Sequence, residues 1–375
     1  MSLNLKTPCQ IIDLDQLNQN MKIVKIIKEQ TNCNVLLALK GFSSKSIFPY
    51  LYAALDGASA SSLNEARLGF EEFQKQVHTF SPSYTIDDFE SIAQYSTHIN
   101  FNSCRQFLEF YKTAKKHGCT CGLRINPNFS EVEIAAINPC RKYSRLGVIK
   151  QELQIHMDQI LPYLDGVHMH TMCELMSDSL EKTIAIVEND FPLLLKKCRW
   201  FNLGGGQLYS DPEYDIAHAC QCINYLQNKY QLEVFIEPCE GLMLNTGYLA
   251  TKVIDIVHNG IDIAILDASA VCHLPNTLSA PYQCEILGAD TEGLHKYKYQ
   301  LTGNTCYAGD IWGDYYFPSP LHIGDILYFC DTAQYSQVKS SMFNGLSFPA
   351  LATYSKHTGL QILKTYEYKT FLEII

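Results

Sequence analysis

The sequence predicts an α/β protein in which a (β/α)8 TIM-type barrel is followed by a mostly antiparallel β domain. Up to about residue 240, eight short apolar runs alternate with stretches of helical periodicity. Eight strand–helix units in succession favour a closed parallel barrel over an open sheet. After Gly241 the helical periodicity fades, and turn signals such as Asn259-Gly260 and Ile323-Gly324 separate short alternating runs. That pattern is typical of antiparallel sheets.

The strand candidates define two domains, the number that a length of 375 residues suggests. We expect the barrel to span residues 15–240, and the β domain to combine residues 241–375 with residues 1–14. The N-terminal strand candidate, 10–14, precedes the barrel's first strand and can pair with the second domain. The expected barrel strands are 35–39, 54–60, 77–80, 98–101, 120–125, 166–170, 199–203 and 233–236, with helices such as 16–28, 103–117 and 178–189 beside them. Expected strands of the β domain include 252–258, 262–266, 297–301 and 325–329.

Composition argues against several classes of protein. The net charge of -10 disfavours nonspecific binding to nucleic acid, and no apolar run approaches the roughly twenty residues that span a bilayer. The 15 cysteines are odd in number and scattered, and no signal peptide precedes them. They indicate reduced thiols and a cytoplasmic location. The pairs Cys119/Cys121 and Cys220/Cys222 lack a second pair at zinc-site spacing, so structural zinc is not expected.

Lys40 ends the first apolar run, Val-Leu-Leu-Ala-Leu-Lys-Gly-Phe at 35–42. An amine at the edge of an apolar core has its charged form disfavoured, so more of it is neutral and able to form a Schiff base with an aldehyde. Taken alone, the octapeptide better fits a strand-end lysine that snorkels to solvent. The other strand ends decide between these interpretations.

Polar or glycine residues also follow the other strands, and barrel active sites lie at the C-terminal strand ends. The glycine triplet follows strand seven, where such barrels commonly bind phosphate. A carboxylate after strand eight can hold a proton on a pyridine nitrogen. Together with the lysine and a strand-six histidine, these features predict pyridoxal 5'-phosphate as cofactor. In strand order the rim residues are Lys40, Ser59, His78, Asn102, Arg124, His168 with His170, then Gly204, Gly205 and Gly206, and Glu237.

His168 and His170 are two residues apart, so both point to one face of their strand. With Cys173 and Glu174 they could bind a metal. They could instead fill the barrel interior, or one imidazole could stack on a cofactor ring. We favour stacking and expect no metal, because a planar imidazole suits a phosphate-anchored aldehyde better than it suits ligation here.

Cys306 lies in the stretch 303–315, which is rich in glycine, aspartate and aromatic residues. A thiol has a pKa near the working range and can deliver a proton. A simply buried cysteine is the alternative interpretation.

These motifs together resemble the fold type III pyridoxal-phosphate decarboxylases, which pair an alanine-racemase-like barrel with a β domain. The likeness covers most of the chain, and its specific strings are HMHTMCE at 168–174 and TCYAGD at 305–310. The resemblance implies a homodimer with active sites shared between subunits, so that Cys306 acts as a proton donor in trans. We also expect Asp310 to pair with Arg145 of the partner subunit. The implied cofactor residues are Lys40 (Schiff base), His170 (ring stacking), Glu237 (ring nitrogen), Arg124 (near the ring), and Gly204, Gly205, Gly206 and Tyr335 (phosphate).

Within this group the likeness is greatest to the branch that decarboxylates carboxynorspermidine and carboxyspermidine in polyamine biosynthesis. It implies a carboxylated polyamine as substrate, whose cationic nitrogens need carboxylates. The residues expected to recognise these nitrogens are Glu240 and the amide of Asn276, with Glu174 and Asp314 as further helpers. Three positions depart from related patterns. Ser59 stands where decarboxylases of basic amino acids commonly have aspartate, Cys239 replaces a usual glycine, and Asn276 replaces a usual aspartate.

Three other functions remain open at this point. The chain could decarboxylate another basic or diamino acid, such as diaminopimelate or ornithine, although no arginine follows Glu237-Pro238-Cys239. It could be a metal-dependent barrel hydrolase that uses His168, His170 and Glu174. It could also be a non-enzymatic carrier of pyridoxal phosphate, although such carriers lack a second β domain.

Overall fold

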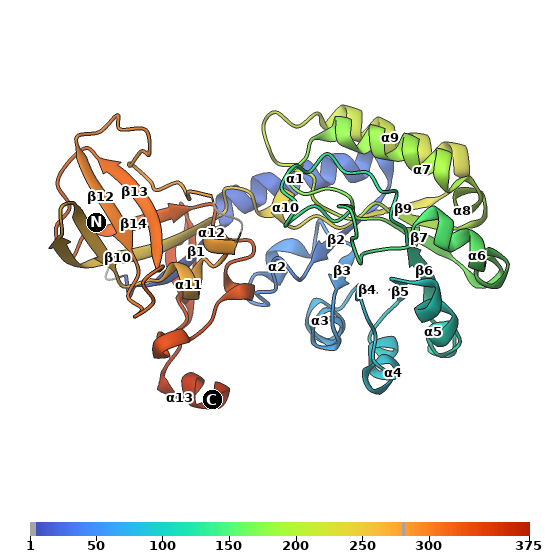
Figure 1. Cartoon of the computed structure of the whole chain (residues 1–375), viewed down its shortest axis with the longest axis horizontal. Helices are drawn as coiled ribbons and strands as arrows, with labels where there is room; N and C mark the ends of the chain where they lie inside the picture. The colour runs from blue at the N-terminus through green and yellow to red at the C-terminus, as the bar shows by residue number, and fades with distance from the viewer. Residues whose placement is uncertain (1–4, 280–281) are drawn as a thin grey trace. The chain divides into compact units, whose positions relative to one another are not determined.

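The computed structural model describes residues 5–279 and 282–375, so residues 1–4 and 280–281 of the expected β domain lie outside the described residues. The chain divides into two compact units. The barrel unit is Asn20–Leu242, and the sheet unit joins Met1–Gln19 with Met243–Ile375. Each unit is described by itself below, with the element labels of Figure 1.

Eight parallel strands close into a barrel in chain order, which confirms the predicted fold class. Their central residues are buried, as the apolar runs indicated. The strands are β2 (Asn34–Ala38), β3 (Gly57–Ala60), β4 (Gln76–Phe80), β5 (His98–Phe101), β6 (Thr120–Arg124), β7 (Gly166–His168), β8 (Trp200–Asn202) and β9 (Glu233–Ile236).

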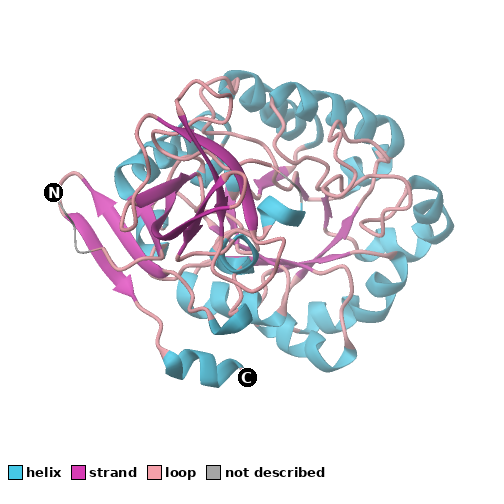
Figure 2. Ribbon diagram, turned by 60° about the vertical axis from the view of Figure 1, so that its left-hand side comes forward, coloured by secondary structure: helices cyan, strands magenta, loops and turns pink. Residues whose placement is uncertain are grey.

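Helices surround the barrel strands on the outside (Figure 2). Several begin at a residue whose side chain caps the first turn. At α5, Ser103 Oγ accepts from the Gln106 N–H at 3.2 Å, which satisfies one of the unpaired amides of the helix end. The helices are α1 (Leu14–Thr31), α2 (Phe48–Leu51), α3 (Leu63–Leu68), α4 (Ile86–Gln94), α5 (Cys104–Lys116), α6 (Lys150–Ile160), α7 (Ser177–Asp190), α8 (Pro192–Lys197), α9 (Ile216–Tyr230) and α10 (Glu240–Met243), with short π and 3-10 turns at Gly69–Phe73 and Leu161–Tyr163.

Aromatic rings fill the barrel interior below the strand ends. A Cβ at Gly166 would lie 1.9 Å from the Trp200 ring, so this strand needs glycine to admit the indole. His78 is completely buried and stacks on His98 with ring centroids 3.8 Å apart. The prediction that His78 lies at the rim was therefore wrong. His78 is in the middle of β4, and Phe80 ends that strand.

The sheet unit contains one sheet in the order β13-β12-β11-β10-β1-β15-β16, with β14 also paired to β10. As expected, the N-terminal strand joins this sheet, where β1 is antiparallel to β10 and parallel to β15. Trp312 and Phe329 belong to its core. The strands are β1 (Cys9–Asp13), β10 (Gly247–His258), β11 (Asp262–Leu266), β12 (Tyr297–Thr302), β13 (Ile311–Phe317), β14 (Ile326–Cys330), β15 (Ala350–Ser355) and β16 (Gly359–Lys364), and the helices are α11 (Ala270–His273), α12 (Asn276–Ser279) and α13 (Tyr368–Ile374), with 3-10 turns at Gln337–Lys339 and Phe343–Gly345.

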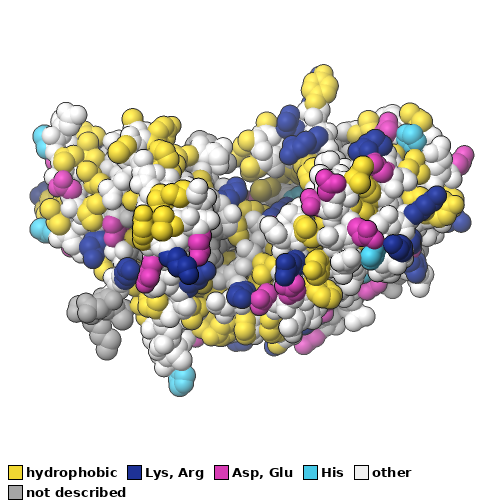
Figure 3. Space-filling view, turned by 90° about the horizontal axis from the view of Figure 1, so that it is seen from below, with side chains coloured by type: hydrophobic (Ala, Val, Ile, Leu, Met, Phe, Trp, Pro, Cys, Tyr) yellow, Lys and Arg dark blue, Asp and Glu magenta, His cyan; other side chains and the backbone are white. Residues whose placement is uncertain are grey.

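The surface carries interspersed charges of both signs. On the face shown in Figure 3, lysine and arginine side chains alternate with aspartate and glutamate. Within residues 5–279 and 282–375, no helix combines the length and apolar character needed to cross a membrane.

Candidate active site

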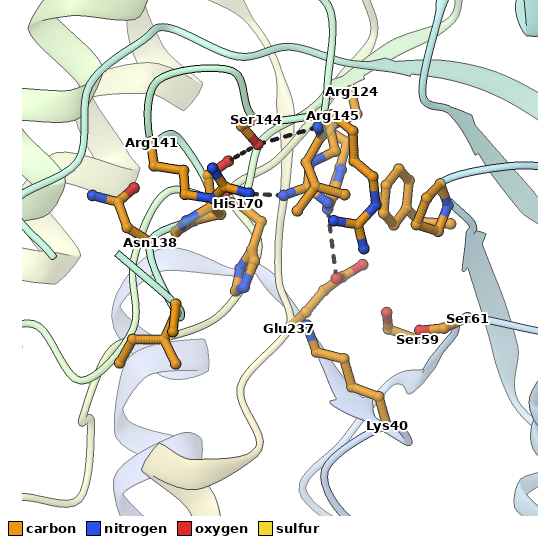
Figure 4. Close-up of a pocket in the computed structure, with 17 residues that line it drawn as sticks. Lys40, Ser59, Ser61, Arg124, Asn138, Arg141, Ser144, Arg145, His170 and Glu237 are labelled. Carbon is orange, nitrogen blue, oxygen red and sulfur yellow. Dashed lines mark hydrogen bonds and ion pairs between the residues drawn. The ribbon is translucent and has the colours of Figure 1, made fainter. Parts of the chain in front are cut away.

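A cavity of about 460 Å³ opens at the C-terminal ends of the barrel strands. Four of the predicted cofactor residues line it: Lys40 after β2, Arg124 at the end of β6, His170 after β7 and Glu237 after β9. Their side chains surround the same space in Figure 4. Because parallel strands deliver their ends to one rim, residues separated by almost 200 positions meet here.

Lys40 follows three strand residues with no exposed surface, and its own side chain is open to the cavity. Because the side chain lines the cavity, the structure favours the Schiff-base interpretation over snorkelling. The surrounding barrel atoms and then the charge of Arg124 lower the pKa of Lys40, while Glu237 acts in the opposite direction. A lowered lysine pKa increases the neutral fraction, which is the nucleophilic form.

Glu237 has two different neighbours for its two oxygens. Asn202 Nδ2 donates to Oε1 at 2.6 Å, and His168 Nε2 lies 3.6 Å from Oε2. Burial raises the pKa of Glu237, but the contacts with His168, Asn202 and Lys40 outweigh burial, so the pKa lies below its usual range. The carboxylate is therefore ionised and able to pair with a protonated ring nitrogen.

His170 is held by the backbone of the glycine triplet. The Gly205 N–H donates to His170 Nδ1 at 3.1 Å, so the ring's own proton is assigned to Nε2. Burial, followed by the charges of Lys40 and Arg124, lowers the pKa of His170 well below its usual value. The imidazole is thus a neutral, oriented plane, which suits stacking on an aromatic cofactor.

The glycine triplet makes a turn that no larger residue fits. A Cβ would lie 2.3 Å from the Met169 carbonyl oxygen at Gly204 and 2.0 Å from that of Met172 at Gly206, and both residues have positive φ. The Gly204 N–H donates to Asn202 Oδ1 at 2.9 Å. In the described part of the chain, the Gly206 N–H alone of the three amides meets no acceptor. Gly204 and Gly205 therefore donate to the side chains of Asn202 and His170. The phosphate contact of the triplet stays a prediction.

Arg124 supplies a buried positive charge. Its Nη2 donates to the His170 carbonyl oxygen at 3.2 Å, and its guanidinium lies 4.5 Å from the centroid of the Phe80 ring. Burial lowers the pKa of Arg124 to about 10, so the group stays cationic at neutral pH. It can attract an anionic group of a bound ligand.

The motif at 168–174 divides into two parts. Its two histidines do not lie in one group of ligand atoms with Glu174, as the metal-dependent hydrolase hypothesis requires. His168 and His170 line the cavity, whereas Cys173 and Glu174 meet Glu240. Over the described ranges, this Cys–Glu–Glu group is the one whose ligand atoms lie within 4.8 Å of one another. It contains neither histidine.

The carboxylates of Glu174 and Glu240 and the amine of Lys40 all affect the pKa of the Cys173 thiol. Burial raises the pKa of Cys173 to about 12, with further contributions from Glu240 and Glu174, while Lys40 lowers it. Glu174 also has a positive φ of 55°, which is unusual for a residue other than glycine. The structure thus brings the predicted substrate residues Glu174 and Glu240 together near the lysine.

Four other predicted residues belong to the sheet unit. Cys306 is the exposed cysteine among the fifteen, all of which are described, so the buried interpretation was wrong. Asn276 Oδ1 accepts from Lys339 Nζ at 2.6 Å, and Asp314 pairs across strands with Lys298 at 2.7 Å. Tyr335 has a positive φ of 51°. Their roles toward substrate or cofactor stay predictions.

The loop that carries Cys306 is held by Asp310. This carboxylate is 3% exposed and accepts from the Ala270 N–H at 2.8 Å and from Thr305 Oγ1 at 2.7 Å. Asp310 therefore supports the loop from within its own unit. The expected pairing with Arg145 of the partner subunit stays a prediction.

Sequence reasoning missed one wall of the cavity, the loop between β6 and α6. Arg141, Ser144 and Arg145 of this loop line the cavity, as do Ser61 and Phe80. The rim residue Asn102 does not line it. Asn102 Nδ2 donates to the Arg145 carbonyl oxygen at 2.8 Å and its Oδ1 accepts from the Gly147 N–H at 2.7 Å, which fixes the loop. The available signal was the long stretch 126–149, which lacks helical periodicity.

The residues present fit pyridoxal phosphate. An amine with a lowered pKa, an ionised carboxylate and a neutral imidazole surround one cavity. Beside them, the glycine turn keeps an open amide where a Cβ would collide with backbone. Among the described residues, neither ring nitrogen of buried His168 has a hydrogen-bond partner, so this side chain can still bind a polar group of a ligand.

Comparison with known proteins identifies the family of this chain. Residues 50–333 match the family model described as the pyridoxal-dependent decarboxylase C-terminal sheet domain. The chain is 35% identical to a carboxynorspermidine/carboxyspermidine decarboxylase of Campylobacter jejuni over 98% of both chains. It is 36% identical to a carboxyaminopropylagmatine decarboxylase of Synechocystis over 98% of this chain and 95% of that protein.

A solved structure of carboxynorspermidine decarboxylase from Campylobacter jejuni, complexed with norspermidine, is 33% identical and superposes with a TM-score of 0.92. The match covers 99% of this chain and all of that chain. The barrel, Lys40, Glu237 and the glycine turn thus occur in a chain whose relatives are decarboxylases along nearly their whole length. This chain belongs to the pyridoxal-dependent decarboxylase family and is a carboxy-lyase that uses pyridoxal 5'-phosphate.

Proposed function

We propose that the enzyme decarboxylates a carboxylated polyamine, carboxynorspermidine or carboxyspermidine, and so forms norspermidine or spermidine. The observation that carries this proposal is the meeting of Glu174 and Glu240 beside the thiol that Lys40 also influences. A polyamine brings several ammonium groups, and two adjacent carboxylates can bind them with charge-assisted hydrogen bonds. The names of the Campylobacter relatives support the same substrate class.

Each barrel residue of the site has its own role in the reaction. Bound pyridoxal phosphate supplies the electron sink that accepts the electrons left when CO2 departs. Lys40 holds the cofactor through its amine, and ionised Glu237 keeps a proton on the ring nitrogen. His170 presents its neutral ring to the cofactor plane, and Arg124 and the Gly206 amide offer positive partners to an anion. We assign delivery of a proton to the product carbon to Cys306.

Glu174→Gln and Glu240→Gln are expected to raise KM for carboxynorspermidine by roughly 10-fold to 100-fold each, with a much smaller change in kcat. The reason is that the carboxylates bind the distal ammonium groups in the ground state and the transition state alike. Steady-state CO2 release measures both constants. Glu181→Gln, on the outer helix α7, is the matched control. A fall in kcat at unchanged KM would contradict the assignment.

A second candidate substrate is carboxyaminopropylagmatine, which the 36% identical Synechocystis relative supports. Its guanidinium group also suits a pair of carboxylates. CO2 release from carboxynorspermidine, carboxyspermidine, carboxyaminopropylagmatine, diaminopimelate and ornithine separates the candidates by kcat/KM. Turnover of only the last two would overturn the polyamine proposal.

We also propose that the enzyme is a cytoplasmic homodimer in which Cys306 of one protomer serves the Lys40 site of its partner. The exposure of Cys306 on a loop held by Asp310 supports a role outside its own core. All fifteen cysteines are free, which suits a reducing compartment.

Mixing Lys40→Ala with Cys306→Ala protein is expected to restore roughly a quarter of the wild-type activity, because half of randomly mixed dimers would contain one intact site of two. Each variant alone should be strongly impaired. Subunit exchange is verified by native mass spectrometry before CO2 release is measured. If exchange is complete and no activity returns, Cys306 does not act in trans.

A further inference from the structure

We propose that Asn202 is a positioning residue that fixes the Glu237 carboxylate and the glycine turn with a single side chain. Asn202 ends β8 and has no exposed surface. Its Nδ2 donates to Glu237 Oε1 at 2.6 Å, and its Oδ1 accepts from the Gly204 N–H at 2.9 Å. The inference rests on the use of pyridoxal phosphate, and it does not depend on which polyamine is the substrate.

The two contacts determine the orientation of the amide. The Gly204 N–H can only donate, and an ionised carboxylate can only accept, so the oxygen of Asn202 must face Gly204 and the nitrogen must face Glu237. The second N–H has a further neighbour, because Nδ1 of buried His78 lies 3.5 Å from Nδ2. Only a side chain with a donor and an acceptor on one short plane satisfies both contacts.

In this geometry the two carboxylate oxygens of Glu237 have different partners. Oε1 is tied to Asn202, which leaves Oε2 on the side of His168. Gly204 in turn is the first residue of the glycine triplet. The N–H of the third residue, Gly206, meets no acceptor among the described residues. Asn202 therefore couples the group that meets the ring nitrogen to the turn that meets the phosphate. Losing Asn202 disturbs cofactor binding at two points at once.

The Asn202→Asp variant distinguishes the contact with Glu237 from the contact with Gly204. Aspartate keeps an acceptor for Gly204 but replaces the donor with a second carboxylate about 2.6 Å from Glu237. Two carboxylates this close do not both ionise readily and share a proton with a raised pKa. At pH 8.5 the variant is expected to bind pyridoxal phosphate at least about 10-fold more weakly than wild type. At pH 6, where the shared proton restores a donor, the affinity returns to within about 3-fold.

Cofactor analogues identify which contact is lost. Apo protein is titrated with pyridoxal phosphate, with pyridoxal, and with the 1-deaza analogue that lacks the ring nitrogen, and absorbance reports the Kd. The defect of Asn202→Asp persists with pyridoxal and disappears with the deaza analogue. Asn202→Ala additionally reduces the preference for pyridoxal phosphate over pyridoxal, because Gly204 has lost its partner. A defect that is equal for all three ligands overturns the proposal.

Asn102 provides the matched control. It directly follows a barrel strand, β5, and bridges a carbonyl oxygen and a glycine N–H, but its partners are Arg145 and Gly147. Asn102→Asp is expected to show no loss of affinity that returns at pH 6. Wild-type cofactor affinity in Asn202→Asp at both pH values, or the same pH response in Asn102→Asp, overturns the inference.

A double-mutant cycle covers the case in which Asn202→Asp does not fold. Asn202→Ala is introduced into wild type and into Glu237→Ala, which removes the acceptor of the Asn202 N–H, and each protein is titrated with pyridoxal phosphate. Residues in contact have non-additive effects, so the loss in the Glu237→Ala background is expected to be several-fold smaller. Additive losses contradict the proposal. Cofactor binding is measured without any substrate, so this outcome is distinct from failure of the polyamine assignment.

Discussion

Lys40→Ala is expected to lower CO2 release by at least about 10³-fold, because the residue is the only side chain proposed to join the cofactor covalently. The variant should also lose the visible absorbance of lysine-bound cofactor. Lys45→Ala is the matched control, since Lys45 is an exposed lysine five residues away that pairs with Glu72. Full activity in Lys40→Ala would refute the proposed site.

The pH dependence of cofactor capture tests the electrostatics around Lys40. Only the neutral amine reacts with the aldehyde, so the rate should rise with pH and level off above the lowered pKa of Lys40. The positive charge of Arg124 disfavours the ammonium form, so Arg124→Met should move this midpoint to higher pH. Glu237 favours the ammonium form, so Glu237→Gln should move it to lower pH. Stopped-flow absorbance on apo protein measures both shifts, and shifts in the opposite directions would exclude this arrangement.

Glu237→Gln is expected to reduce kcat by roughly 10² to 10³-fold, the usual effect of removing one oriented electrostatic partner from an active site. Glutamine retains an oxygen for the Asn202 N–H but cannot pair with a protonated ring nitrogen. The cofactor should therefore still bind, while the electron sink is weakened. CO2 release and cofactor affinity measured on the same preparation separate these two effects.

The control for this change lies on the same strand. Glu233 begins β9 at the opposite end of the barrel and accepts from Asn34 Nδ2 at 2.8 Å. Glu233→Gln should leave kcat within about 2-fold of wild type, as is usual for a surface substitution. If Glu237→Gln behaved like Glu233→Gln, the carboxylate would have no part in the chemistry.

The barrel was predictable because its signals are local. Short apolar runs bury both faces of a strand, and helical periodicity lies between them, so each unit can be identified from about thirty consecutive residues. In the sheet unit the same reasoning missed β13, β15 and β16. β15 pairs with the distant strand β1, with residues 9 and 350 side by side, whereas β13 and β16 pair with β12 and β15, the strands that precede them. Such strands are stabilised by cross-strand contacts more than by their own pattern.

The candidate site was predictable where a residue stands at a strand end or within two positions after it. Lys40, Arg124 and Glu237 follow this rule and line the cavity. His78 does not, because it precedes the end of β4 by two residues and its side chain enters the aromatic interior. A side chain two residues earlier on a strand points to the same side of the sheet, but it lies in a different layer of the barrel interior. Sequence alone does not fix that depth.

By itself, the sequence determined the fold class, the cofactor and the rim that carries Lys40, Glu237 and the glycine turn, because strand order and strand ends follow from local patterns. Tertiary structure alone decided how the polar groups of that rim share their hydrogen bonds. It separated the histidines from Glu174, and it placed Asn202 between Glu237 and Gly204. These choices depend on atoms a few ångströms apart that come from different strands, and no local pattern encodes such distances.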